Sequence, residues 1–142
     1  MRINDVIRRK GSTVVTIAPS QTVRQLLDLL AEHRIGAVVV STDGRTIEGI
    51  VSERDIVRHL QTRGAEVLSA QVREIMTSEV TTCQLNDDIE QLMNVMTDQR
   101  VWHIPVVVDG ELRAIVSIGD VVKHRIVELQ SERDELVGYL NS

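Results

Sequence analysis

The chain carries the same short motif twice. The run Gly49–Asp55 (Gly-Ile-Val-Ser-Glu-Arg-Asp) returns as Ala114–Asp120 (Ala-Ile-Val-Ser-Ile-Gly-Asp). Each copy is an apolar, strand-like run followed by Ser-x-x-Asp, and the two aspartates lie 65 positions apart in a chain of 142 residues. A repeat at nearly half the chain length predicts two copies of one small unit, which carry two related sites across a pseudo-twofold axis.

The size of the repeat also predicts how the copies pack. A unit of about 65 residues buries too little of its surface to be stable alone, so we expect the two copies to share a core. Hydrophobic residues make up 42% of the chain, which is ordinary for a globular protein. No apolar run reaches membrane-spanning length, and the N-terminus lacks the apolar core of a signal peptide. These features predict a cytoplasmic protein.

Charge and cysteine usage narrow the possible partners. The net charge is −5 and no long basic stretch is present, which argues against nucleic acid but permits a small anionic ligand. Cys83 is the single cysteine, so the sequence predicts neither a disulfide framework nor a thiolate metal cluster. We interpret Cys83 as a small apolar core residue. The four histidines show no metal-ligand spacing, and we expect no metal.

Hydrophobic spacing predicts the same order of elements in both copies. In the first copy we expect strand, helix, strand, strand and helix over residues 13–17, 20–34, 37–40, 47–51 and 52–62. In the second copy we expect a strand over residues 80–83, a helix that begins at Asn86 and carries the apolar residues Ile89, Leu92, Met93 and Met96, strands over 103–108 and 112–116, and a helix from 117 onward. Ser20, Asn86 and Ser52 are the predicted N-caps. The fold class is mixed α/β, with two β-α-β-β-α repeats over residues 1–66 and 67–142.

This order, the duplication and the motif Gly49–Asp55 resemble the cystathionine β-synthase (CBS) domain family, and the lead-in Val72–Thr77 (Val-Arg-Glu-Ile-Met-Thr) strengthens the resemblance. The chain looks like a stand-alone tandem CBS pair, or Bateman module, over about residues 5–126. The resemblance implies a regulatory protein and not an enzyme. It implies an adenine nucleotide as regulatory ligand, AMP first, with ADP, ATP, NAD(H) or S-adenosylmethionine as alternatives, and no obligatory cofactor.

The motif residues suit such a ligand. By the resemblance, Asp55 and Asp120 would accept hydrogen bonds from the two ribose hydroxyls, and bonds to a charged acceptor are strong. Ser52 and Ser117 stand at helix N-termini, where free N–H groups favour a phosphate. Arg54 adds a cation in the first copy, whereas Gly119 takes its place in the second.

The resemblance also places the adenine, between the lead-in and the first hairpin strand of the same copy. The residues implied in the first copy are Lys10, Gly11 and Val14, facing Ala37 and Val38. The residues implied in the second copy are Thr77 and Val80, facing His103, Ile104 and Pro105. His103 would also reach the phosphate bound in the first copy, a contact that Ala37 cannot return. We therefore rank the first-copy site as the better nucleotide site.

Each of these residues also has a plain structural interpretation. The serines can be N-caps and the aspartates favourable first-turn residues, without any ligand. Arg54 can be a solvated charge, and Trp102 is interpreted as a packing side chain. The second hypothesis for the whole chain is therefore a ligand-free interaction dimer that retains the fold. An enzyme is disfavoured because no nucleophile–base pair, carboxylate dyad or Walker-type loop is present.

The last helix continues beyond its counterpart in the first copy. Its apolar residues are Val121, Val122, Ile126, Leu129, Leu136 and Leu140, at helical spacing without a clean heptad. We expect a homodimer in which this helix adds contact area, and an effector protein that receives the signal. The alternative is a helix folded back on its own chain.

Overall fold

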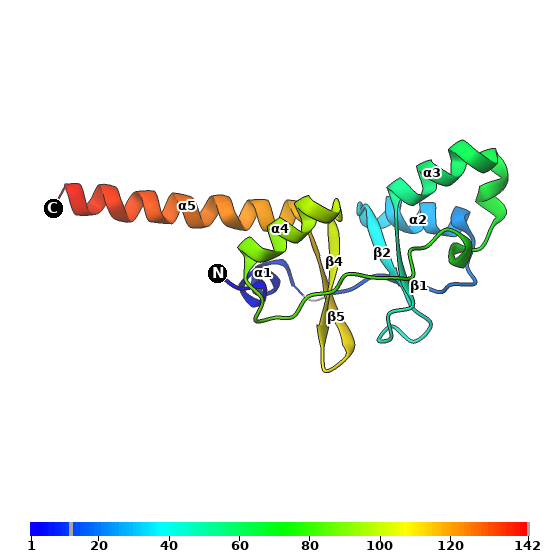
Figure 1. Cartoon of the computed structure of the whole chain (residues 1–142), viewed down its shortest axis with the longest axis horizontal. Coiled ribbons are helices and arrows are strands. Elements are labelled where there is room, and N and C mark those ends of the chain that lie inside the picture. The colour runs from blue at the N-terminus through cyan, green and yellow to red at the C-terminus, as the bar shows by residue number, and fades with distance from the viewer. Residues whose placement is uncertain (12, 142) are drawn as a thin grey trace.

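The computed structural model describes residues 1–11 and 13–141, which form two lobes and one protruding helix (Figure 1). The first lobe is built from β1 (Thr16–Ile17), α2 (Val23–His33), β2 (Ala37–Val40), β3 (Gly49–Ser52), α3 (Glu53–Arg63) and the short 3₁₀ helices η1 (Gly64–Ser69) and η2 (Val72–Glu74). The second lobe is built from α1 (Ile3–Lys10), α4 (Ile89–Gln99), β4 (His103–Val108), β5 (Glu111–Ser117) and α5 (Ile118–Leu140).

Both lobes contain small sheets, and the predicted mixed α/β class is confirmed. In the first lobe β1 pairs parallel with β2, and β2 pairs antiparallel with β3. In the second lobe β4 and β5 form an antiparallel hairpin. The strand predicted at residues 80–83 is reduced to one residue, because only Cys83 bridges Val106 in parallel. The preceding residues leave the sheet and line a cleft instead.

Two predicted helix caps are wrong by two residues each. The N-cap of α2 is Thr22 and not Ser20, and the N-cap of α4 is Asp88 and not Asn86. Thr22 accepts a hydrogen bond from the Gln25 N–H at 3.2 Å, and the Gln25 side chain accepts one from the Thr22 N–H at 2.9 Å. This reciprocal pair satisfies two free backbone groups, which the Ser20 position cannot do.

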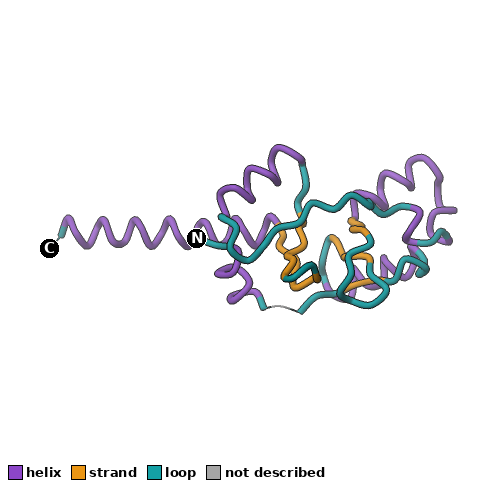
Figure 2. Tube along the Cα trace, turned by 60° about the horizontal axis from the view of Figure 1, so that its bottom comes forward, coloured by secondary structure: helices purple, strands orange, loops and turns teal. Residues whose placement is uncertain are grey.

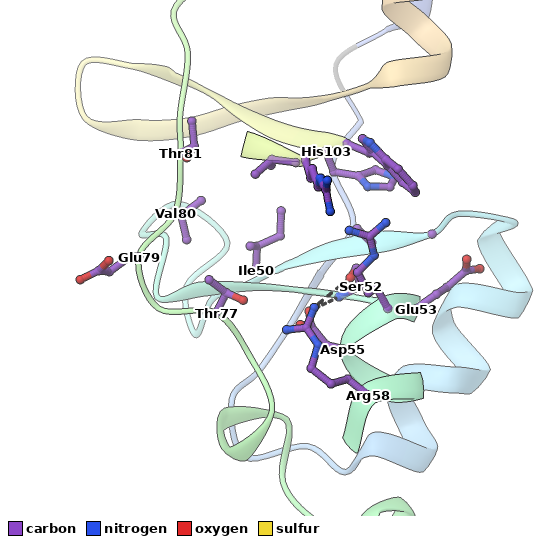
Figure 3. Close-up of a pocket in the computed structure, with 16 residues that line it drawn as sticks. Ile50, Ser52, Glu53, Asp55, Arg58, Thr77, Glu79, Val80, Thr81 and His103 are labelled. Carbon is purple, nitrogen blue, oxygen red and sulfur yellow. Dashed lines mark hydrogen bonds between the residues drawn. The ribbon is translucent and has the colours of Figure 1, made fainter. Parts of the chain in front are cut away.

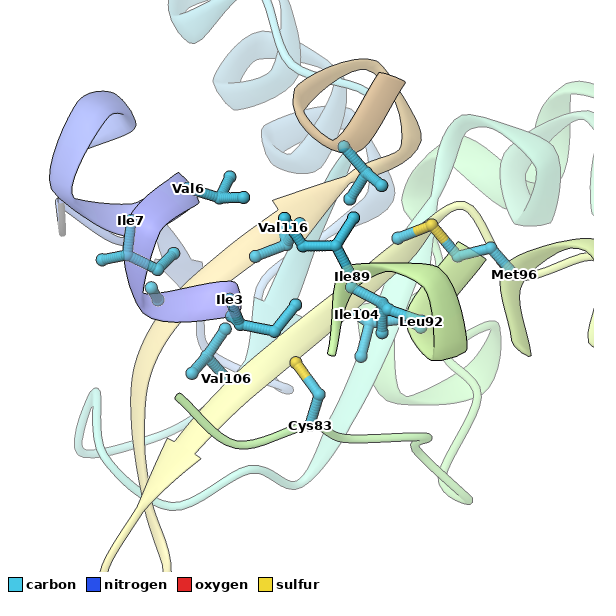
Figure 4. Close-up of a cluster of buried hydrophobic side chains, with 12 residues drawn as sticks. Ile3, Val6, Ile7, Cys83, Ile89, Leu92, Met96, Ile104, Val106 and Val116 are labelled. Atoms are coloured by element: carbon cyan, nitrogen blue, oxygen red, sulfur yellow. The ribbon is translucent and has the colours of Figure 1, made fainter. Parts of the chain in front are cut away.

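The two lobes do not share one core, contrary to the expectation. Buried residues of the first lobe form one cluster, which includes Val67 and Val72 from the segment after α3. Buried residues of the second lobe form another cluster, which includes Ile3, Val6 and Ile7 from α1 (Figure 4). Each lobe is therefore completed by a segment from the other half of the sequence. The predicted boundary between the two repeats, at residues 66 and 67, stays a prediction.

The helix α5 extends well beyond the second lobe (Figures 1 and 2). It begins in the core, where Val121 and His124 are buried, and its outer half is exposed throughout. Leu136 is 60% exposed and Leu140 is 72% exposed. The alternative in which the helix folds back on its own chain is therefore wrong. Among the described residues no helix is long and apolar enough to cross a membrane.

Candidate functional site

A cavity of about 260 Å³ lies where the first lobe meets the start of β4 (Figure 3). Its walls come from the β2 start, from β3, from the first turns of α3, from the segment at residues 77–81 and from the residues just before and at the start of β4. The motif residues of the first copy that line it are Ile50, Ser52, Glu53, Arg54 and Asp55. The cleft therefore combines one Ser-x-x-Asp junction with parts of the second repeat.

The Ser52–Asp55 junction holds a carboxylate at the start of a helix. Ser52 is the last residue of β3 and has extended backbone, and α3 begins at Glu53. The Oδ2 atom of Asp55 accepts hydrogen bonds from the Ser52 N–H at 2.9 Å and from the Ser52 hydroxyl at 3.2 Å. In the described part of the chain, the second oxygen of Asp55 makes no hydrogen bond. Asp55 is thus oriented and still has an acceptor available at the cleft.

The apolar end of the cleft depends on a close approach between β3 and the residues after η2. The N–H of Ile50 donates to the Thr77 carbonyl at 2.9 Å, and the N–H of Thr77 donates to the Ile50 carbonyl at 2.9 Å. Gly49 makes this approach possible, because a Cβ there would lie 2.7 Å from the Met76 sulfur and 2.9 Å from the Thr77 carbonyl oxygen. The slot that results is lined by Ala37, Ile50 and Val80.

The other end of the cleft carries positive charge. Arg54 and Arg58 lie on successive turns of α3, and Arg100 is the residue with left-handed backbone that ends α4. The guanidinium of Arg54 lies 4.2 Å from the centre of the Trp102 ring, a cation–π contact between the two repeats. Trp102 is 47% exposed, so its ring packs against Arg54 at the cleft and not in the core of a lobe.

His103 stands between the two repeats, at the start of β4. The pKa of His103 is lowered, mainly by burial and to a smaller extent by the positive charge of Lys10. The carboxylates of Glu53 and Asp120 oppose this shift only in part. The imidazole is therefore neutral at pH 7, so one ring nitrogen donates a hydrogen bond and the other accepts one. His103 adds a polar group to the cleft and not a further fixed charge.

Each lead-in, the segment that precedes the first strand of a repeat, contacts the other repeat. This is the reverse of the sequence-based expectation. Lys10 does not face Ala37, because its ammonium donates to Asp120 at 2.5 Å and to the Ile115 carbonyl at 2.7 Å, both in the second repeat. Conversely, Thr77 and Val80 line the cleft of the first repeat. The reason is the packing described above, because the apolar residues of each lead-in are buried in the core of the other lobe.

The remaining predicted residues divide in a simple way. Ala37, Ser52, Arg54, Asp55, Thr77, Val80 and His103 meet at the first cleft. Val38 is buried in the core of the first lobe, and Ile104 and Pro105 are buried in the second. Val14 packs against the core of the second lobe, and Gly11 is an exposed residue with φ of 91° directly after α1. These residues do not line the cleft of the first repeat.

Sequence reasoning missed several cleft residues. Arg58 follows Arg54 by one helical turn, and this spacing was a signal that could have identified it. Glu53 and Glu79 also line the cleft. Arg100 had no sequence signal, because its role depends on the left-handed turn between α4 and β4. Within the described residues, no cluster of three or more His, Cys, Asp or Glu side chains could hold a metal ion.

The junction of the second copy has the same internal geometry. The N–H of Ser117 donates to Asp120 Oδ2 at 2.9 Å, and the N–H of Asp120 donates to the Ser117 hydroxyl at 3.2 Å. Burial disfavours the charged form of Asp120, but the hydrogen bonds from Lys10 and Ser117 outweigh it, so the pKa of Asp120 lies below its usual value. Asp120 is therefore an ionised carboxylate with a cation already bound to it.

Two repeats of helix, strand pair and helix, the first preceded by β1 and the second by the single bridge of Cys83, carry matching Ser-x-x-Asp junctions and define a tandem-repeat module. The model of the CBS domain family matches residues 3–62 and 72–127. The chain therefore belongs to the CBS domain family, and the resemblance seen in the sequence is confirmed.

Relatives with known sequences or structures agree with this. A mitochondrial CBS domain-containing protein of Arabidopsis thaliana is 33% identical over 146 residues, which span 97% of this chain and 71% of that protein. The crystal structure of a CBS-domain containing protein of Agrobacterium tumefaciens is 43% identical and superposes with a TM-score of 0.85, covering 88% of this chain and 99% of that one. A CBS domain pair crystallised with 5′-methylthioadenosine and S-adenosyl-L-methionine is 19% identical, with a TM-score of 0.79 over 90% of this chain and 98% of that one, and it shares the fold.

Proposed function

We propose that this protein is a regulatory sensor that binds an adenine nucleotide in the cleft of the first repeat, AMP first, with ADP, ATP or NAD(H) as alternatives. The observation that carries the proposal is the Asp55 carboxylate, which Ser52 orients toward a cleft with an apolar slot at one end and arginines at the other. A nucleotide has the same sequence of chemical groups: a flat apolar base, a ribose with two hydroxyls, and a phosphate.

Each group of the nucleotide then has a partner of matching chemistry. The ribose hydroxyls donate to Asp55, and bonds to a charged acceptor are about twice as strong as neutral ones. The base occupies the slot beside Ala37, Ile50 and Val80. The phosphate lies at the N-terminus of α3, where the helix dipole favours an anion. The guanidinium groups of the cleft supply the remaining countercharge.

Relatives support the ligand class. The CBS domain pair of 19% identity was crystallised with two adenosine derivatives. A further CBS structure of the same fold, 21% identical, is described as an archaeal homologue of the γ subunit of AMPK. We propose by extension that this chain also binds an adenosine-containing ligand, acts without catalysis or an obligatory cofactor, works in the cytoplasm and signals to an effector protein.

The exposed side chains of α5 favour a second element of the proposal, a homodimer. From its second quarter onward the helix presents Ile126, Leu129, Leu136 and Leu140, all about half exposed or more. We expect Leu129→Glu with Leu136→Glu to shift the mass in solution from dimer to monomer, measured by light scattering after gel filtration. An exchange at the polar positions Gln130→Glu and Ser131→Glu is the matched control. A wild-type protein that is monomeric would remove this part of the proposal.

A thermal-shift panel tests the ligand. AMP, ADP, ATP, NADH and S-adenosylmethionine are compared on the wild type, on Asp55→Ala and on Asp98→Ala, an exposed aspartate of α4 outside the cleft. Ligand at about 100 times its dissociation constant adds about 2.7 kcal/mol to the unfolding free energy, which corresponds to roughly 5–10 °C for a chain of this size. We expect this shift in the wild type and in Asp98→Ala, and its loss in Asp55→Ala. A flat panel on the wild type would favour the ligand-free dimer.

A further inference from the structure

The carboxylate of the second junction is already bound by a residue of the chain itself. The Lys10 ammonium lies 2.5 Å from Asp120 Oδ2 and donates a second hydrogen bond to the Ile115 carbonyl at 2.7 Å. Both side chains are only about a third exposed or less. In the first repeat, no described residue forms an ion pair with Asp55. The two junctions thus differ in what occupies the carboxylate, although their internal hydrogen bonds agree.

The register of the repeat shows which position Lys10 takes. Ile115 corresponds to Ile50, as Asp120 corresponds to Asp55. In the first repeat the Ile50 carbonyl accepts a hydrogen bond from the Thr77 backbone, which forms the wall of the slot. In the second repeat the Ile115 carbonyl accepts from the Lys10 side chain. The ammonium therefore bridges the wall of the slot and the carboxylate, which are the places that a base and a ribose would contact.

Lys10 is held in this position by its helix. It is the last residue of α1, and the apolar residues Ile3, Val6 and Ile7 anchor α1 in the core of the second lobe. At the other end of α1, the amino group of Met1 lies 4.0 Å from the Glu128 carboxylate on α5. The lysine is thus delivered by a packed helix, which lowers the entropy cost of its contact with Asp120.

We propose that Lys10 is a built-in occupant of the second Ser-x-x-Asp site, so that the chain binds one nucleotide and not two. The ammonium takes the hydrogen bonds that a ribose would make to Asp120 and covers the Ile115 edge of the slot. This inference rests on the proposed function, because it takes the first cleft as the pattern of a working site. A ligand can enter the second site only by displacing Lys10 from both partners.

Titration calorimetry with AMP and ATP tests this in a background where the first site is removed. Asp55→Ala alone binds no nucleotide. Asp55→Ala with Lys10→Met, which keeps the apolar stem but removes the charge, gains one site. Adding Asp120→Ala removes that site again. Lys10→Arg keeps the cation and leaves the second site closed, and Lys123→Met, which replaces an exposed lysine of α5, is the matched control.

Each outcome separates the two ideas. If the Asp55→Ala, Lys10→Met protein folds and binds neither nucleotide, Lys10 is not what closes the second site and the inference is wrong. If the wild type binds no nucleotide but Lys10→Met does, the proposed function of the first cleft is wrong and the inference stands. Circular dichroism and thermal unfolding show that each variant is folded. Should the double variant be unfolded, Lys10→Met alone decides, with two bound nucleotides expected in place of one.

Discussion

The two Ser-x-x-Asp junctions have the same local backbone structure, but their aspartates differ in what lies beside the carboxylate. At Asp55 the serine orients the carboxylate and a cleft opens beside it. At Asp120 the serine does the same, but Lys10 binds the carboxylate. The comparison teaches that the motif determines only the local turn and the direction of the carboxylate. Whether the carboxylate is available depends on which distant segment packs beside it.

The largest expected effect concerns the core of the second lobe, whose first strand is reduced to Cys83. Burial, together with the negative charge of Asp87, raises the pKa of the Cys83 thiol from its ordinary value of 9.0 to about 12. Three pKa units predict alkylation by iodoacetamide at pH 8 about a thousandfold slower than in unfolded protein. Labelling with and without urea, followed by mass spectrometry, measures the ratio. Fast labelling of the native protein would contradict the burial of Cys83 in this core.

The sign of the pH effect follows from the same shift. A raised pKa means that the folded protein holds the thiol proton more tightly than the unfolded chain does. The thiol therefore contributes no pH dependence to stability below pH 8, and it destabilises the fold as the pH rises from about 9 toward 12.

Removal of the two carboxylates gives the next largest effect. Asp55→Ala removes two charge-assisted hydrogen bonds to ribose, each about 1.5–3 kcal/mol, and we expect at least a hundredfold weaker nucleotide binding. Asp120→Ala leaves binding to the first cleft within about threefold. Calorimetric titration of both variants measures the difference. Equal losses, or a larger loss in Asp120→Ala, would contradict the difference between the two junctions.

The matched positions Gly49 and Ala114 test the wall of each slot. Gly49→Ala forces a Cβ into the Met76 sulfur and the Thr77 carbonyl oxygen, and overpacking of this kind costs about 1–3 kcal/mol of unfolding free energy. Ala114→Gly, in the buried equivalent position, costs about 0.5–1 kcal/mol through chain entropy. Urea unfolding gives both values. A neutral Gly49→Ala would mean that the approach of Thr77 to β3 is not required.

The smallest effect is expected for the contact between Arg54 and Trp102, which has no counterpart at Gly119. A partly exposed cation–π pair contributes about 0.5–1 kcal/mol. A double-mutant cycle with Arg54→Ala and Trp102→Ala should give a coupling energy of that size in the absence of ligand. The cycle Arg63→Ala and Trp102→Ala is the control, because Arg63 pairs with Glu74 on another surface. A coupling energy of zero in the first cycle would mean that the contact between Arg54 and Trp102 does not stabilise the protein.

The sequence predicted the local structure well and the long-range packing poorly. The strand–helix junctions at Ser52 and Ser117 follow from a motif of four residues and its capping chemistry, so they could be predicted. The cleft residues of the first repeat could be predicted in part, because Asp55 and Ser52 belong to that motif. The exchange of lead-ins could not, since Lys10 and Thr77 belong to one repeat in the order of the sequence and pack against the other in space.

That exchange has a consequence for how the chain reaches its native state. During synthesis α1 emerges before the rest of its lobe, because the buried residues that cover Ile3, Val6 and Ile7 belong to the second half of the chain. The apolar face of α1 therefore stays exposed to solvent until residues 83–121 have left the ribosome. Contacts at such separations slow folding, because a long loop must close before they form. The first repeat can condense around residues 17–76 meanwhile, so the lobe with the open cleft forms before the lobe that contains the N-terminus.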